Sequence, residues 1–279
     1  MPREHLFSPQ VAVSVSPFRR THVRATVSQH MLAPGAEEFL PPASAGLWLP
    51  PERTFAPLAG AGDFRSERVR HVEVAVEQVF DETYVVGVRR FYERSADQIV
   101  TLFGLSDATD PLGHYLVASG GAVDADGWGV SLSSPFVGRL RGSVDYSRTE
   151  ARWAPSSGMR MIAAAAPAAA RAEVESFHDV TTSLEAAIPE TSTRVFFVYK
   201  VNSAFARSDG ATEEPGFDGR FDLRVHQLLP FMDAASSEWE VLVAVRNLFR
   251  EPVAGGSVYD ELLVVRPPKR VIGGVLVRF

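Results

Sequence analysis

The chain has 279 residues, of which 46% are hydrophobic and 22% are charged, and its formal net charge is −6, so it is neither a nucleic-acid scaffold nor a disordered acidic tail. No apolar run reaches the ~18 residues of a transmembrane helix, which excludes a helical membrane protein. Cysteine is absent, which excludes disulfide frameworks, zinc–cysteine sites and thiol catalysis.

In chain order, the first residues lack the basic region and apolar stretch of a secretion signal, so the protein is either cytoplasmic or begins elsewhere. Beyond them, apolar and polar residues alternate with period two, which is typical of half-buried β-strands. Val72, Val74 and Val76, for example, fall on one face, and His71 and Glu73 on the other. The pattern predicts eleven strands, at residues 8–16, 20–31, 66–80, 83–94, 126–134, 138–152, 173–186, 193–205, 218–229, 237–248 and 269–279.

The connections between these strands alternate in length. Short links are expected at 17–19, 81–82, 134–137, 187–192 and 230–236, and longer loops at 32–65, 95–125, 153–172, 206–217 and 250–268. Within the third loop, the alanine-rich residues 163–171 are expected to form a short helix or to pack there. Such sorting is typical of an antiparallel up-and-down membrane β-barrel, with short periplasmic turns and long outer loops. A soluble β-sandwich remains an alternative, because its strands alternate in the same way.

Aromatic side chains lie near the ends of predicted strands, where a membrane barrel carries its interfacial girdles. These residues are Tyr84, Trp128, Tyr146, Trp153, Trp239 and Phe279. The last two strands predict a lipid-facing wall made of Trp239, Val241, Val243, Val245, Val271, Val275 and Val277.

Arginines recur on the faces expected to line the lumen. The candidates are Arg89, Arg139, Arg141, Arg194, Arg220, Arg224 and Arg246. One interpretation is a hydrated charge ladder, paired across strands with Glu73, Asp145, Asp222 and Glu240. The other is attraction of anionic solutes or of acidic groups on a plug domain.

The C-terminal residues resemble a known family. The run from Gly219 to Phe231 is followed by a strand ending Asn247-Leu248-Phe249, by Tyr259-Asp260, and by a last strand that closes on Arg278-Phe279. This order is similar to the C-terminal part of the barrel of TonB-dependent outer-membrane receptors. The resemblance implies that Phe279 is the terminal signal read by the barrel-assembly machinery.

The resemblance also implies a barrel of twenty-two strands, preceded by a plug domain, a TonB-contacting box and a signal peptide. Because only eleven strands are predicted, we expect residues 1–279 to be the C-terminal half of such a barrel, without plug or signal peptide. The expected location is the bacterial outer membrane. The expected partners are outer-membrane lipid, the barrel-assembly machinery, TonB through the missing N-terminal part, and a scarce solute such as a siderophore, cofactor or oligosaccharide. A small complete porin-like barrel of ten or twelve strands is a further alternative.

Catalytic patterns are missing from the sequence. It contains no Gly-x-Ser-x-Gly elbow and no His-Glu-x-x-His zinc helix. His71, Glu73 and Glu77 share one strand face, where a solvated lumen wall is favoured over a metal site. We therefore expect a non-enzymatic protein with no cofactor, no metal and no nucleic-acid partner.

Overall fold

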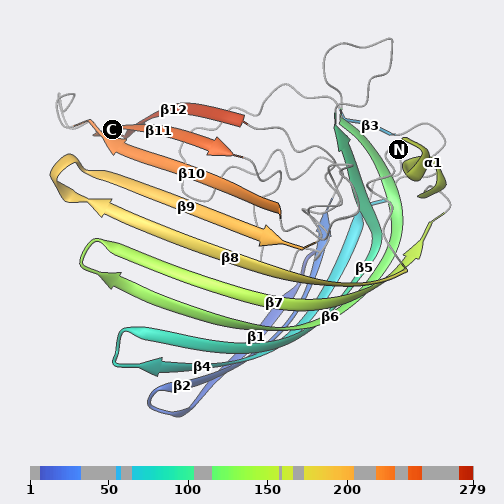
Figure 1. Ribbon diagram of the computed structural model, residues 1–279, viewed down its shortest axis with the longest axis horizontal. Helices are drawn as coiled ribbons and strands as arrows, with labels where there is room; N and C mark the ends of the chain where they lie inside the picture. The colour runs from blue at the N-terminus through green and yellow to red at the C-terminus, as the bar shows by residue number, and fades with distance from the viewer. Residues whose placement is uncertain are drawn as a thin grey trace.

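A computed structural model describes residues 7–32, 55–57, 65–103, 115–156, 159–165, 173–203, 218–229, 238–246 and 270–278. In these residues the chain forms one sheet in which each long strand pairs antiparallel with the next along the chain (Figure 1). The order is β1-β2-β4-β5-β6-β7-β8-β9-β10-β11-β12, and the short β3 pairs in parallel with β6. The predicted fold class, an all-β up-and-down sheet of eleven antiparallel strands in a partial barrel, is confirmed.

The strand bounds follow the period-two alternation closely. They are β1 (Gln10–Phe18), β2 (Thr21–Leu32), β3 (Phe55–Pro57), β4 (Glu67–Phe80), β5 (Tyr84–Phe103), β6 (Tyr115–Val137), β7 (Leu140–Pro155), β8 (Val174–Ile188), β9 (Thr193–Asn202), β10 (Asp218–Leu228), β11 (Glu238–Arg246) and β12 (Arg270–Arg278). The sheet curves strongly along its width, and within the described residues β1 and β12 each pair on one side only (Figure 1).

The prediction of a long loop at residues 95–125 is wrong at both ends of that range. Residues 95–103 extend β5 and residues 115–125 extend β6, which leaves 104–114 outside the described residues. The register shifts between Ser95 and Gln98, where Asp97 has a φ of 57°, and Gly121 opposite has a φ of 124°. These bulges shift the phase of the side chains, so the sequence loses its period-two signal although the strands continue.

The alanine-rich segment contains a helix, α1 (Met159–Ala165), that begins four residues before the predicted stretch at 163–171. Residues 166–172 lie outside the described part of the chain. Among the described residues, no helix is long and apolar enough to cross a membrane.

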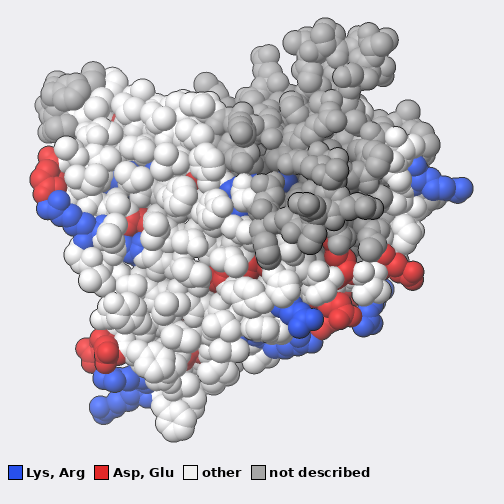
Figure 2. Space-filling view, viewed as in Figure 1, with Lys and Arg blue, Asp and Glu red and all other residues white. Residues whose placement is uncertain are grey.

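Alternation and register give the sheet two faces of opposite character. The apolar face carries one or more large apolar side chains from every strand of the antiparallel path, and representative ones are 37–59% exposed. They are Val13, Val27, Val74, Val88, Leu132, Val144, Leu184, Tyr199, Phe221, Val243 and Val275. The polar face carries the intervening residues, many of them charged and several buried. In Figure 2, acidic and basic groups on the visible surface lie mostly beside one another, between wide uncharged stretches.

A dry core lies where β5 and β6 extend beyond the bulges. Ile99, Val100, Thr101 and Leu102 are consecutive and all essentially fully buried, so both faces of β5 are covered there. The buried Glu67 carboxylate lies next to them and accepts hydrogen bonds from the side-chain amide of Gln98, at 2.9 and 3.0 Å, and from the Ile99 backbone N–H at 2.8 Å. These bonds hold the bulge in one conformation and satisfy a carboxylate that water does not reach.

Candidate functional site: the polar face of the sheet

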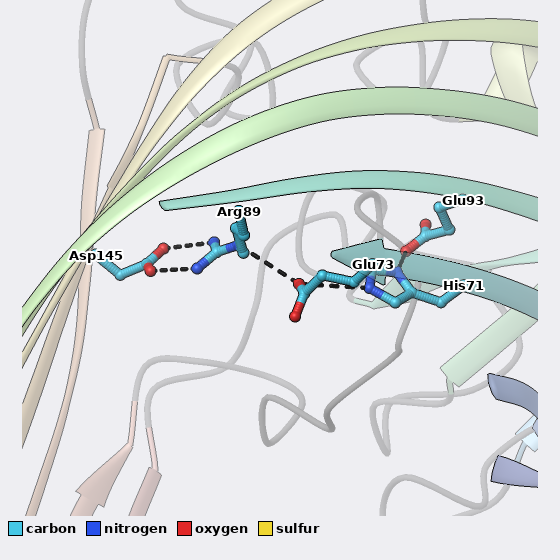
Figure 3. Close-up of polar contacts among 5 residues, drawn as sticks. All are labelled: His71, Glu73, Arg89, Glu93 and Asp145. Carbon is cyan, nitrogen blue, oxygen red and sulfur yellow. Dashed lines mark hydrogen bonds and ion pairs between the residues drawn. The ribbon is translucent and has the colours of Figure 1, made fainter. Parts of the chain in front are cut away.

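A chain of charged groups crosses the polar face from β4 to β7 (Figure 3). Arg89 of β5 makes a bidentate ion pair with Asp145 of β7, with Nη2 donating to Oδ1 at 2.6 Å. Its Nε lies 3.7 Å from Glu73 Oε2, and the same oxygen lies 3.7 Å from His71 Nε2. The other ring nitrogen of His71 lies 3.5 Å from the buried Glu93 carboxylate. Three carboxylates and two basic groups therefore neutralise most of one another's charge.

Arg89 reaches Asp145 because β6, the strand between them, carries glycine at the crossing point. A Cβ placed on Gly129 would lie 3.0 Å from Arg89 Cζ and 3.0 Å from the Tyr146 carbonyl oxygen. Two residues away, a Cβ on Gly127 would lie 2.4 Å from the Phe91 ring. Glycine at these two positions thus lets side chains of β5 lie flat over β6.

A second polar cluster joins β8 and β9 on the same face. Asp179 accepts a hydrogen bond from Asn202 Nδ2 at 2.8 Å and from Thr181 Oγ1 at 3.1 Å, and its Oδ2 lies 3.4 Å from Lys200 Nζ. Farther along the sheet, His226 Nδ1 of β10 lies 2.7 Å from Glu240 Oε1 of β11. Each carboxylate in these clusters faces a neighbouring strand, which ties the strands laterally.

Most of the predicted lumen arginines lie on the polar face. Arg141, Arg194, Arg220 and Arg224 all lie on the polar face by register, and Arg141 pairs with Glu185 of β8. Arg246 is paired in register with Asp222 and Arg270, but its side chain lies outside the described structure.

Arg139 differs from this group because it lies in the two-residue turn between β6 and β7 and not on a strand face. There it pairs with Glu190 of the next hairpin turn. For Arg89, the ladder interpretation holds, since both Glu73 and Asp145 are its partners.

The residues predicted as the lipid-facing wall share one face of β11 and β12. Register pairs Trp239 with Val277, Val241 with Val275 and Val245 with Val271, while Val243 lies opposite Gly273 on the same face. Phe279 lies outside the described residues.

One aromatic assigned to the girdle lies elsewhere. Trp153 is buried on the polar face, and its Nε1 donates to the Gly120 carbonyl at 3.1 Å. The bulges that lengthen β5 and β6 place it against the dry core instead of an interface.

A cavity of about 550 Å³ opens at the end of the sheet that carries the short turns. Its lining includes Arg141, Glu185, Phe196 and Arg224. Among the described residues, no group of three or more histidine, aspartate or glutamate side chains is arranged to hold a metal ion. The polar face therefore presents paired charges and an open cavity.

Sequence reasoning missed two features of this face. The Glu67–Gln98 contact depends on a bulge that no residue pattern announces. The Asp179–Lys200–Asn202 cluster depends on the register between β8 and β9, which alternation alone leaves open. The adjacent His178 lies on the apolar face, as alternation predicts, and its Nδ1 lies 2.7 Å from the Tyr146 hydroxyl.

No protein-family model matches the chain. No curated protein matches it either. Among solved structures, however, the chain is similar over most of its length to a siderophore receptor, an iron transporter and an outer membrane transporter.

Three of these structures illustrate the likeness. The siderophore receptor PirA from Pseudomonas aeruginosa is 14% identical over 89% of this chain and 40% of its own, with a TM-score of 0.39. The FrpB iron transporter from Neisseria meningitidis (F3-3 variant) is 14% identical over 96% of this chain and 38% of its own, with a TM-score of 0.41. The outer membrane transporter YddB from Escherichia coli is 8% identical over 93% of this chain and 38% of its own, with a TM-score of 0.40. The chain thus spans 38–40% of the length of these three proteins.

Proposed function

We propose that this chain forms part of the wall of a bacterial outer-membrane barrel that, when complete, takes up a scarce solute. One observation carries the proposal. Across all eleven antiparallel strands, large apolar side chains stand exposed on one face, while the other face carries ion pairs. A soluble protein rarely leaves so wide an apolar surface in water, whereas a membrane barrel turns that face to lipid and its charged face to the lumen.

The height of the apolar face supports the same proposal. On β4 it runs over residues 72–80, from Val72 to Phe80, between Arg70 and the turn at Asp81. The eight steps from the first to the last of these residues, at about 3.3 Å each, span roughly 26 Å along the strand. At the ~35–45° tilt of barrel strands this gives about 20 Å across the layer, close to the ~25 Å apolar band of outer-membrane barrels.

In the part of the chain that the structure describes, the sheet has two unpaired edges, which support a further part of the proposal: that these strands are the C-terminal half of a larger barrel. Unpaired backbone groups in lipid each cost several kcal/mol, so β1 and β12 need neighbours. With eleven antiparallel strands, β1 and β12 run in the same direction. An odd number of further strands then closes the barrel with antiparallel pairs at both seams and gives the even total of bacterial barrels.

The remaining parts of the proposal rest on the resemblance of the C-terminal sequence. They are energy supplied through TonB, insertion by the barrel-assembly machinery, and a solute of the siderophore, cofactor or oligosaccharide class. We propose Phe279 as the assembly signal. In cells, the full-length gene product carrying Phe279→Asp should accumulate less in the outer membrane than one carrying Arg278→Asp, the matched control. Equal accumulation of the two variants contradicts the assignment.

Vesicle flotation tests the membrane proposal itself. The complete barrel that contains these strands is refolded from urea with phosphatidylcholine vesicles and centrifuged through a density gradient. We expect folded protein, with a β-type circular dichroism spectrum, to float with the vesicles. Recovery of folded, monodisperse protein in detergent-free buffer refutes the proposal and supports a soluble sandwich.

A further inference from the structure

On the apolar face, from the row of Val74 toward the end of the sheet opposite the short turns, the strands carry a set of exposed arginines that the wall itself does not require. This outer basic belt comprises six arginines and three carboxylates on β4 to β7. Its members are Arg68, Arg70, Arg90, Arg94, Arg148, Arg152, Asp124, Asp126 and Glu150. The belt lies toward the end of the strands opposite the short turns, because Arg70 lies eleven residues before Asp81, where the turn after β4 begins, and Arg94 pairs with Arg70 in register.

Register places the belt in rows across the sheet. In one row Arg70 lies opposite Arg94, and Arg94 opposite Asp124, which in turn lies opposite Arg152. In the row that begins at Val74 of the apolar band, Trp128 lies between Arg90 and Arg148, so the belt and the band overlap there. Rows are about 6.6 Å apart, and opposite side chains have Cβ atoms ~4.5–5.5 Å apart.

The three carboxylates of the belt balance only half of its six arginines, so the belt carries a net positive charge. Arg90 pairs with Asp126 at 2.5 Å, Arg94 with Asp124 at 3.5 Å and Arg152 with Glu150 at 3.2 Å. These three arginine side chains are still 62–68% exposed.

The other three arginines have weaker partners or none. Among the described residues, Arg68 and Arg148 have no acidic partner, and Arg70 donates only to Gln29, at 3.3 Å. Arg70 and Arg94 also lie directly opposite each other, and like charges in that position are destabilising. An anion bound between them relieves this repulsion.

The opposite end of the sheet provides an internal comparison. The described hairpin turns there carry Arg19, Arg20 and Arg139 against Asp81, Glu82 and Glu190. Two of these arginines pair with two of these carboxylates, Arg20 with Glu82 and Arg139 with Glu190. Within the described residues, the positive excess therefore lies at one rim of the apolar band.

We propose that the outer basic belt binds the phosphate groups of anionic lipid headgroups in the leaflet at the end of the strands opposite the short turns. The inference rests on the proposed membrane function, because that places the apolar band in the acyl chains and the belt at headgroup height. Guanidinium groups bind phosphate oxygens in pairs, which suits a row of exposed arginines. Tyr92, Trp128 and Tyr146 lie on the same face at the boundary, where aromatic side chains favour the headgroup region.

Native mass spectrometry of the whole chain in neutral detergent tests the proposal by counting retained lipids. The probes are diphosphoryl lipid A, phosphatidylcholine and inorganic phosphate. We expect the wild-type chain to retain diphosphoryl lipid A at concentrations where phosphatidylcholine is lost. The variant Arg70→Gln with Arg94→Gln should bind the phosphorylated lipid at least about tenfold more weakly. The matched variant Arg19→Gln with Arg20→Gln, which removes the same charge at the other rim, should bind it within about twofold of wild type.

Three results overturn the inference. They are equal retention of the charged and zwitterionic lipids, equal weakening by the two arginine pairs, and displacement of the lipid by inorganic phosphate at similar concentration, which indicates a small-anion site. Vesicle flotation keeps this test separate from the membrane proposal. A chain that floats but shows no lipid preference refutes only the headgroup assignment, whereas a chain that does not float refutes both.

Discussion

Replacing Leu132 by arginine places a charge at the middle of the apolar face. Leu132 lies on β6 between Phe136 and Trp128, opposite Val86 and Val144, and it is 48% exposed. In a bilayer, arginine at the midplane of a barrel wall costs about 2–4 kcal/mol. In water the loss is limited to the contacts of the buried half of the side chain, roughly 1 kcal/mol.

The neighbouring residue provides the control. Ser133 lies on the other face and lines the open cavity of about 550 Å³. Ser133→Arg is expected to cost less than about 0.5 kcal/mol in either medium. The two variants introduce the same charge at adjacent residues of one strand. The difference between their free energies of unfolding therefore reports the effect of the face alone.

Urea unfolding from phosphatidylcholine vesicles, followed by tryptophan fluorescence, measures both variants. The free energy of unfolding of Leu132→Arg should fall about 2–4 kcal/mol below wild type, a large part of a typical total of ~5–15 kcal/mol. If both variants lose the same amount, or neither loses more than about 1 kcal/mol, the assignment of this face to lipid is refuted.

Three further predictions concern the polar face and the core. Arg89→Met leaves two carboxylates of the polar face without their shared cation and should lower the free energy of unfolding by about 1–3 kcal/mol; an unchanged urea midpoint contradicts the ladder. Gly127→Ala should lower the free energy of unfolding by about 1–3 kcal/mol, because its Cβ collides with the Phe91 ring and with a backbone carbonyl at 2.6 Å. Gly273→Ala, with open space around it, should be near neutral. Equal thermal unfolding of the two variants contradicts this prediction. Glu67→Ala removes the acceptor of the Ile99 N–H, so hydrogen exchange at that amide should accelerate at least tenfold, and unchanged protection rules out the proposed role of the carboxylate.

The sequence predicts the strands well because the physical cause of the pattern is local. A strand with one apolar and one polar face alternates with period two, and β7 shows this alternation along Val144, Asp145 and Tyr146. Where both faces become buried, as at Ile99 and Val100, alternation disappears and the strand is mistaken for a loop. The same physics explains why β5 and β6 are longer than predicted.

The polar contacts are less accessible to sequence reasoning because they depend on register. Arg89 and Asp145 are 56 residues apart and belong to strands that are not neighbours. Their pairing needs glycine at position 129, a residue with no chemistry of its own. Arg139 shows the converse case, since a single-residue uncertainty at a strand end moves a residue from the lumen wall to a turn.

The central claim is that the apolar face contacts lipid while the polar face contacts water. Because the chain contains no cysteine, single spin labels can be attached without background. Labels at Val130→Cys, Ser131→Cys, Leu132→Cys and Ser133→Cys on β6 are compared in the vesicle-bound chain. We expect the labels at Val130 and Leu132 to collide mainly with dissolved oxygen, and those at Ser131 and Ser133 with a water-soluble nickel complex. Equal access of nickel to all four positions contradicts the account.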